Sequence, residues 1–273
     1  MNPSSKVDIK AEVGVFGGSG FYEFLKIEEE VSIETEYGKP SDKIIIGNLD
    51  GIKVAFLPRH SRIHSIPPHI INYRANISAM KMLGVKQIFS PCAAGSLQTF
   101  IKPGDFVICD QFVDRTSSRK DTFYDGPHTT HISMAEPYCP DLRKIVIESA
   151  RELDITCHEK GTVVIIQGPR FSTRSESRWY SGQGWEVINM TQYPEVTLAR
   201  ELEMCFVNIS LITDYDAGLE GNPDIKAVSS QDIVKIFHEN NDRLRLLLFK
   251  AIPKVLKSRN CICSSALKGA VIS

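Results

Sequence analysis

The stretch from Arg59 to His69 places two arginines and three histidines within eleven residues. A guanidinium can hold a phosphate-like oxyanion through two parallel hydrogen bonds. A metal site is less favoured, because the stretch has no Asp or Glu and its prolines disfavour the helix that would pair His60 with His64. We therefore interpret Arg59 and His60 as part of an anion site, with a solvated loop as the main alternative.

Two small-residue turns and an acidic pair follow other apolar segments. The turns at 17–20 and 92–95 would let backbone N–H groups approach an anion, although neither matches a dinucleotide or Walker motif. Asp214 and Asp216 follow the most apolar segment. Partial burial would raise the pKa of such a carboxyl group, so that it could exchange a proton with a leaving group. Plain turns and a polar loop remain the alternatives.

Alternating strands and helices must position these groups. The patterns predict a hairpin over 43–57, helices over 71–83, 142–153, 173–180 and 195–203 and from 229, and strands over 12–16, 31–37, 87–90, 106–112, 161–167, 186–188 and 205–213. This order is typical of an α/β protein with a mixed sheet, in which ligands bind at the carboxyl ends of strands. We expect one domain over 1–273, with 1–10 and 258–273 as tails.

The composition is that of a soluble globular protein, and nothing in the charge balance indicates a nucleic acid or membrane partner. The formal net charge is -1, and 42% of the 273 residues are hydrophobic. No window resembles a membrane span, and the first eleven residues lack the apolar run of a signal peptide, so we expect a cytoplasmic location.

The seven cysteines include Cys261 and Cys263, which are one residue apart. This pair fits no common structural zinc spacing without a second pair, and the sequence shows none. A strained disulfide and two free thiols are the remaining options.

Ten ordered segments resemble the methylthioadenosine phosphorylases of the trimeric purine nucleoside phosphorylase family. They are GGSGFYE (17–23), PRHSRIH (58–64), NYRANI (72–77), AGSL (94–97), PGDFVICDQFVDRT (103–116), FYDG (123–126), MAEPYCP (134–140), GPRFSTR (168–174), INMTQYPEVTLA (188–199) and TDYD (213–216). The resemblance implies the nucleoside phosphorylase fold, with a partly barrel-like mixed sheet flanked by helices. It also implies a cofactor-free and metal-free reaction in which phosphate expels adenine from 5′-methylthioadenosine, with adenosine as a further substrate.

The resemblance also assigns the site. It places phosphate among Ser19, Arg59, His60, Cys92, Ala93 and Thr191, and the nucleoside among His64, His131, Phe171, Ser172, Met190, Asp214 and Asp216. Asp214 and His60 are the expected catalytic residues, and a neighbouring subunit of a trimer or hexamer would lend His131. The position of Cys92 is usually Thr in the family, so one hydroxyl contact to phosphate is missing.

Base preference follows from position 214. Relatives that act on 6-oxopurines commonly have Glu at position 172 and Asn at position 214, whereas this chain has Ser172 and Asp214. A carboxylate accepts hydrogen bonds from an amino group and repels a 6-oxo group. Adenine-type bases are therefore expected, with a 6-oxopurine nucleoside phosphorylase as the alternative.

Overall fold

One mixed sheet organises the part of the chain that the computed structural model describes, namely residues 9–18, 21, 25–127, 129–217, 229–255 and 258–272. Within these ranges eleven strands belong to the sheet. They are β1 (Val13–Gly17), β2 (Glu29–Val31), β3 (Ile44–Leu49), β4 (Ile52–Pro58), β5 (Gln87–Ser96), β6 (Phe106–Val107), β7 (Gln111–Arg115), β9 (Cys157–His158), β10 (Thr162–Ile166), β11 (Val187–Asn189) and β12 (Cys205–Asp214).

The ten-residue strand β5 joins two groups of strands. Its first three residues pair in parallel with β1, almost its whole length pairs in parallel with β12, and β1 pairs in parallel with β4. Its far end pairs antiparallel with β11, which leads through β10 to β7. Because β12 also pairs with β6, the sheet branches instead of forming one flat row. This mixed α/β arrangement confirms the predicted fold class.

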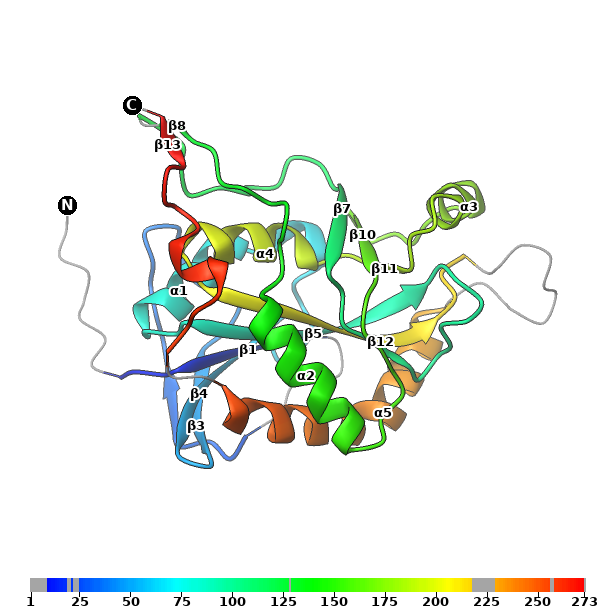
Figure 1. Ribbon diagram of the computed structural model, residues 1–273, viewed down its shortest axis with the longest axis horizontal. Helices are drawn as coiled ribbons and strands as arrows, with labels where there is room; N and C mark the ends of the chain where they lie inside the picture. Colours follow the sequence, from blue (N-terminus) through cyan, green and yellow to red (C-terminus); the bar gives the residue numbers. More distant parts are fainter. Residues whose placement is uncertain are drawn as a thin grey trace.

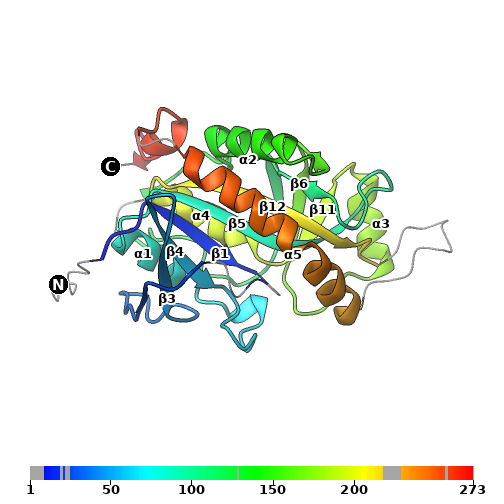
Figure 2. The ribbon, with the colours of Figure 1, turned by 90° about the horizontal axis from the view of Figure 1, so that it is seen from below.

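Helices cover both faces of the sheet (Figure 1). The α-helices are α1 (Tyr73–Met82), α2 (Pro140–Glu152), α3 (Arg174–Gly182), α4 (Gln192–Glu201) and α5 (Ser230–Ala251). Helices α1 and α4 lie over one face, while α2 and α5 lie side by side over the other (Figure 2). Side chains alternate along β12: Val207 and Ile209 pack towards α2 and α5, whereas Phe206 packs towards α1 and α4.

Local signals explain where the helices begin and end. The side chain of Asn72 accepts a hydrogen bond from the backbone N–H of Ala75 and so caps α1, and Thr173 forms a capping box with Glu176 at the start of α3. Although α5 has 22 residues, neither it nor any other helix in the described ranges is long and apolar enough to cross a membrane.

The predicted strand over 31–37 is wrong. Only Val31 belongs to a strand there, at the end of β2, and the chain then forms an isolated bridge between Thr35 and Gly38. Gly38 has φ +92°, and the Thr35 hydroxyl donates to its carbonyl oxygen at 2.7 Å. The hydroxyl and the glycine therefore favour a tight turn over an extended strand. By contrast, β3 and β4 form the predicted hairpin.

The C-terminal segment packs back onto the protein. It contains two short 3-10 helices, η2 (Ile252–Lys254) and η3 (Ile262–Ser265). It ends in β13 (Val271–Ile272), which pairs with β8 (Thr129–Thr130). Elsewhere, a further 3-10 helix, η1 (Pro68–Ile70), precedes α1. All seven cysteines lie in the described ranges and are free thiols, so the disulfide option for Cys261 and Cys263 is not what the structure has.

Candidate active site

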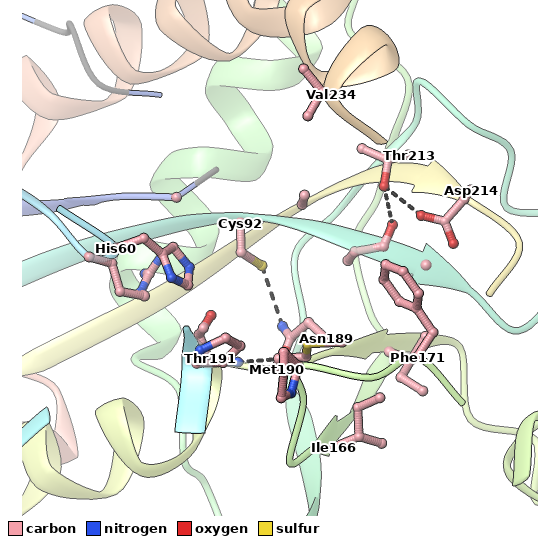
Figure 3. A pocket seen from close by; sticks show the side chains of 18 of the residues that line it. His60, Cys92, Ile166, Phe171, Asn189, Met190, Thr191, Thr213, Asp214 and Val234 are labelled. Atoms are coloured by element: carbon pink, nitrogen blue, oxygen red, sulfur yellow. Dashed lines mark hydrogen bonds between the residues drawn. The ribbon is translucent and has the colours of Figure 1, made fainter. Parts of the chain in front are cut away.

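A cavity of about 630 Å³ opens where β1, β4, β5 and β12 end. Its volume suits a small organic ligand. Ten of the residues predicted from the sequence line it, namely Arg59, His60, His64, Cys92, Ala93, Phe171, Met190, Thr191, Asp214 and Asp216. In Figure 3, His60, Cys92 and Thr191 lie at one end, Asp214 and Phe171 lie at the other, and Met190 lies between them.

Three predicted residues are elsewhere. Ser19 lies outside the described residues. Ser172 is next to the cavity-lining Phe171 but does not line the cavity itself. His131 lines a second cavity beside Asp121 and Glu201, and its backbone N–H donates to the carbonyl oxygen of Ala270 at 2.8 Å.

Arg59 is completely buried and paired within the protein. Its Nε and Nη2 atoms both bond to the Glu195 carboxylate on α4, and Nη2 also donates to the Ser90 hydroxyl at 2.8 Å. The two-pronged contact that the sequence suggested for an anion is therefore made with Glu195. Burial alone would lower the pKa of Arg59, but the Glu195 carboxylate raises it above its ordinary value, so the guanidinium stays charged.

The remaining Arg59 nitrogen, Nη1, lies beside the turn after β1. It makes one long hydrogen bond, 3.4 Å, to the carbonyl oxygen of Pro91. A Cβ atom on Gly18 would come within 3.4 Å of Nη1 and 3.3 Å of the Pro91 oxygen. A residue without a side chain fits there without displacing either atom, so the backbone lies close to the end of the cavity where Arg59, His60 and Cys92 are expected to hold an anion, which we call the anion end.

His60 is buried and uncharged. Burial, followed by the positive charge of Arg59, lowers its pKa to about 4. Its Nδ1 atom is 2.8 Å from the carbonyl oxygen of Ile66, which can only accept, so Nδ1 carries the proton and Nε2 is an acceptor. The ring of His64 lies against it, with the ring centroids 4.8 Å apart.

Asn189 is a cavity residue that the sequence reasoning missed. Its Nδ2 donates to Cys92 Sγ at 3.3 Å, and its Oδ1 accepts from the backbone N–H of Thr191 at 3.4 Å (Figure 3). Cys92 also accepts from Asn208 Nδ2 at 3.4 Å. The thiol is thus held by two amides, and Asn189 links two expected phosphate residues. Its place directly before Met190 and Thr191 was the available signal.

A bend at the end of β12 brings both carboxyl groups to the cavity. The register between β12 and β5 shifts between Ile212 and Asp214, and Asp216 has φ +50°. Asp214 accepts from the Thr213 hydroxyl and from the backbone N–H of Asp216, each at 2.7 Å. Burial raises the pKa of Asp216, and the hydroxyls of nearby serines partly offset this effect.

The sides of the cavity are apolar. Ile166, Phe171 and Met190 line it from the β10–β11 region, and Val234 lines it from α5 (Figure 3). Val234 was missed because it reads as one more apolar position on a long amphipathic helix. The cavity thus has the expected anion end, an acidic end and apolar walls, an arrangement that suits a small organic ligand with both polar and apolar parts.

Comparisons with known proteins agree with this geometry. Residues 12–252 match the model of the phosphorylase superfamily. The chain is 50% identical over 265 residues to S-methyl-5′-thioadenosine phosphorylase from Thermofilum pendens, covering 96% of this chain and 99% of that one. It is 46% identical to a purine nucleoside phosphorylase from Streptomyces coelicolor, covering 96% of each chain.

A solved structure is also similar. Methylthioadenosine phosphorylase from Schistosoma mansoni in complex with adenine superposes with a TM-score of 0.85 and 36% identity, covering 89% of this chain and 91% of that one. The residues that match the family model, 12–252, span the sheet, the cavity and all of α5. The chain therefore belongs to the phosphorylase superfamily.

Proposed function

We propose that the protein catalyses the phosphorolysis of S-methyl-5′-thioadenosine in methionine and purine salvage. An oxygen of inorganic phosphate bonds to C1′ as the C1′–N9 bond breaks, and that bond's electron pair leaves with the purine. The products are adenine and 5-methylthioribose 1-phosphate. The observation that carries the proposal is a single cavity lined by Arg59 and His60 at one end and by Asp214 at the other. The names of the relatives point the same way.

Phosphate is proposed to bind at the anion end. Gly18, Ala93 and Thr191 line it, and the Nη1 atom of Arg59 faces the same turn. His60 offers the acceptor Nε2, which suits the hydroxyl group of a protonated phosphate better than a bare oxygen. The site then needs only to hold the nucleophile in line with C1′ and to stabilise the positive charge that develops on the sugar.

Adenine is proposed to leave from the acidic end. As the C1′–N9 bond breaks, negative charge builds on the purine, and a proton at N7 neutralises it. Asp214 and Asp216 can share one proton with N7 and accept from the 6-amino group. The raised pKa of Asp216 keeps such a proton available closer to neutral pH. No organic cofactor or metal takes part in the proposed reaction, in which phosphate is the co-substrate.

A 6-oxopurine specificity is the second candidate, since one relative is a purine nucleoside phosphorylase. The test is phosphate-dependent base release from methylthioadenosine, adenosine and inosine in parallel. We expect methylthioadenosine to react with the highest kcat/KM and inosine to react poorly. A preference for inosine would contradict the proposed base selectivity. Base release without phosphate would contradict phosphorolysis.

The 5′ end of the substrate is proposed to meet a neighbouring subunit. His131 is exposed and does not line the cavity of its own chain. We therefore propose a homotrimer, alone or paired into a hexamer, in which His131 reaches the adjacent cavity. Light scattering coupled to size-exclusion chromatography measures the mass, and a monomer with full activity would contradict this arrangement.

A further inference from the structure

Four cysteines that are far apart in the sequence meet at one point. Their Sγ atoms all lie within 4.8 Å of one another, and Cys205 and Cys261 are 3.4 Å apart. We call Cys139, Cys205, Cys261 and Cys263 the thiol cluster. Cys139 is the N-cap of α2, Cys205 begins β12, and the other two lie at the start of η3. The sequence analysis found no second pair for Cys261 and Cys263, because the fold supplies it from two separate elements.

The cluster is shielded from water, because its four members are only 1–8% exposed. Cys261, at 8%, is the most accessible and offers a route of entry. Neutral thiols can pack this closely in a buried site, but ionised thiolates at the same distances would repel one another strongly. A cation at their centre converts that repulsion into attraction, because each thiolate then becomes a ligand.

Two neighbouring groups favour negative charge on the cluster. Nη1 of Arg259 is 3.8 Å from Cys205 Sγ and is fixed by a 2.6 Å hydrogen bond to the carbonyl oxygen of Glu203. Cys139 sits at the N-terminus of the 13-residue helix α2, where the helix dipole is positive. Both effects stabilise thiolates and offset part of the excess negative charge of a four-thiolate metal centre.

The spacing fits a tetrahedral ion. Zn–S bonds of about 2.3 Å place the sulfur atoms of a regular tetrahedron about 3.8 Å apart. Cys205 and Cys261 are 3.4 Å apart and no pair is more than 4.8 Å apart, so the four sulfur atoms can close around such an ion with small shifts. Four soft sulfur ligands at this spacing select Zn²⁺ over Mg²⁺ or Ca²⁺, which prefer oxygen.

We propose that the thiol cluster is a structural zinc site, in which one Zn²⁺ replaces the four thiol protons and releases them to solvent. The site is closed, since four protein ligands leave no position for substrate. It is separate from the proposed active site, because none of its residues lines that cavity. The ion would fasten the C-terminal segment to α2 and β12.

Metal content is the first test. Protein made anaerobically with reductant and zinc, then dialysed against a weak chelator, is expected to retain about one Zn²⁺ per chain. The double variant Cys261→Ser/Cys263→Ser is expected to retain less than about a tenth of that. Cys157→Ser is the matched control, because Cys157 is a half-buried thiol outside the cluster, and it should keep the full amount.

Cobalt and thiol counting make the test independent of how well any variant folds. Wild-type protein loaded with Co²⁺ should show the intense sulfur-to-cobalt absorption of a tetrathiolate. Unfolding with a strong chelator but no reductant should expose seven titratable thiols, whereas two disulfides in the cluster would leave three. Three thiols, or less than a tenth of a zinc ion per wild-type chain, would overturn the proposal.

Discussion

At the residue scale, the two ends of the cavity differ in how they carry charge. Arg59 is charged and pairs with Glu195 through Nε and Nη2, which leaves Nη1 with one long hydrogen bond, and His60 is uncharged with Nε2 as an acceptor. Asp214 and Asp216 bring carboxyl groups to the far end. Because the Glu195 carboxylate already neutralises the charge of Arg59, we expect phosphate to meet hydrogen-bonding groups more than an unpaired positive charge. This arrangement favours a phosphate that keeps a proton.

The Asp214→Asn variant is expected to lower kcat/KM for methylthioadenosine by about 10²–10⁴-fold, the usual contribution of a group that moves a proton in the transition state. The amide keeps the size of the side chain but cannot exchange the proton. Initial rates of adenine release at saturating phosphate measure this loss.

A matched control for that variant is Asp50→Asn. Asp50 is exposed in the β3–β4 turn with φ +50°, a conformation that Asn adopts equally well. Its rate should equal that of the wild type. If Asp214→Asn also kept full adenine turnover, the assigned proton exchange at Asp214 would be wrong.

Because His60 is held uncharged in the folded protein, we expect the free energy of unfolding to fall in acid. Its pKa is about 4 in the folded protein, against about 6.5 when unfolded. Between these values the unfolded chain binds a proton that the folded protein does not, so the stabilisation is present above pH 6.5 and is lost as pH falls towards 4. This one group should lower the free energy of unfolding by about 2–3 kcal/mol between pH 7.5 and 4.5.

Urea unfolding of the wild type and of His60→Asn at both pH values isolates that contribution. The variant should lose less stability on acidification than the wild type, by about the same 2–3 kcal/mol. Equal losses in the two proteins would mean that His60 is not held neutral by its surroundings.

At the element scale, the contact between β5 and β12 places the acidic end. A Cβ atom on Gly95 would lie 2.9 Å from Asp214 Oδ1 and 2.9 Å from Ile188 Cγ2. The Gly95→Ala variant should therefore displace Asp214 and reduce adenine release by at least about tenfold, since small misplacements of reacting groups are costly. Gly182→Ala is the control, because nothing lies within 4 Å of its added Cβ atom and its φ is not positive. Equal rates for the two variants would contradict this reading.

The Arg59–Glu195 pair ties the end of β4 to α4. Removing one partner leaves an uncompensated buried charge, so Arg59→Ala should reduce the free energy of unfolding by about 3–5 kcal/mol and raise the apparent KM for phosphate. Arg62, three residues along, forms an exposed pair with Glu30, and Arg62→Ala should cost less than about 1 kcal/mol. Similar losses for both variants in denaturant unfolding would refute this view of Arg59.

Much of this arrangement was predictable from local patterns. The β3–β4 hairpin, the buried strand β12 and the cap of α3 each depend on neighbours in the sequence, and the structure has all three. What escaped prediction depends on distant partners. Glu195 reads as an ordinary acid in an amphipathic segment until α4 brings it against Arg59. Cys139 and Cys205 read as core cysteines until the C-terminal segment reaches them.

At the scale of the whole molecule, the proposed trimer can be tested by asking whether His131 acts in the cavity of the neighbouring subunit. If each cavity needs Asp214 from one chain and His131 from the next, His131→Ala should raise the KM for methylthioadenosine. Trimers assembled from His131→Ala and Asp214→Asn chains should then contain some sites with both native residues. Such mixed trimers should have a lower KM than His131→Ala and a higher kcat than Asp214→Asn. Mixed trimers whose activity is only the average of the two parents would refute the sharing of His131.

The parallel pairing of β5 with β12 has one more consequence. Cys92 lies opposite Ser210 near the anion end, and Gly95 lies opposite Asp214 at the acidic end. Three residues of β5 separate the two levels, which is about 10 Å at the usual rise per residue, and β12 covers the same distance with four residues because of its register shift. The length of these strands therefore sets the distance at which the proposed nucleophile and the departing base are held. Inserting or deleting a residue in either strand would change that length and also turn every following side chain to the opposite face.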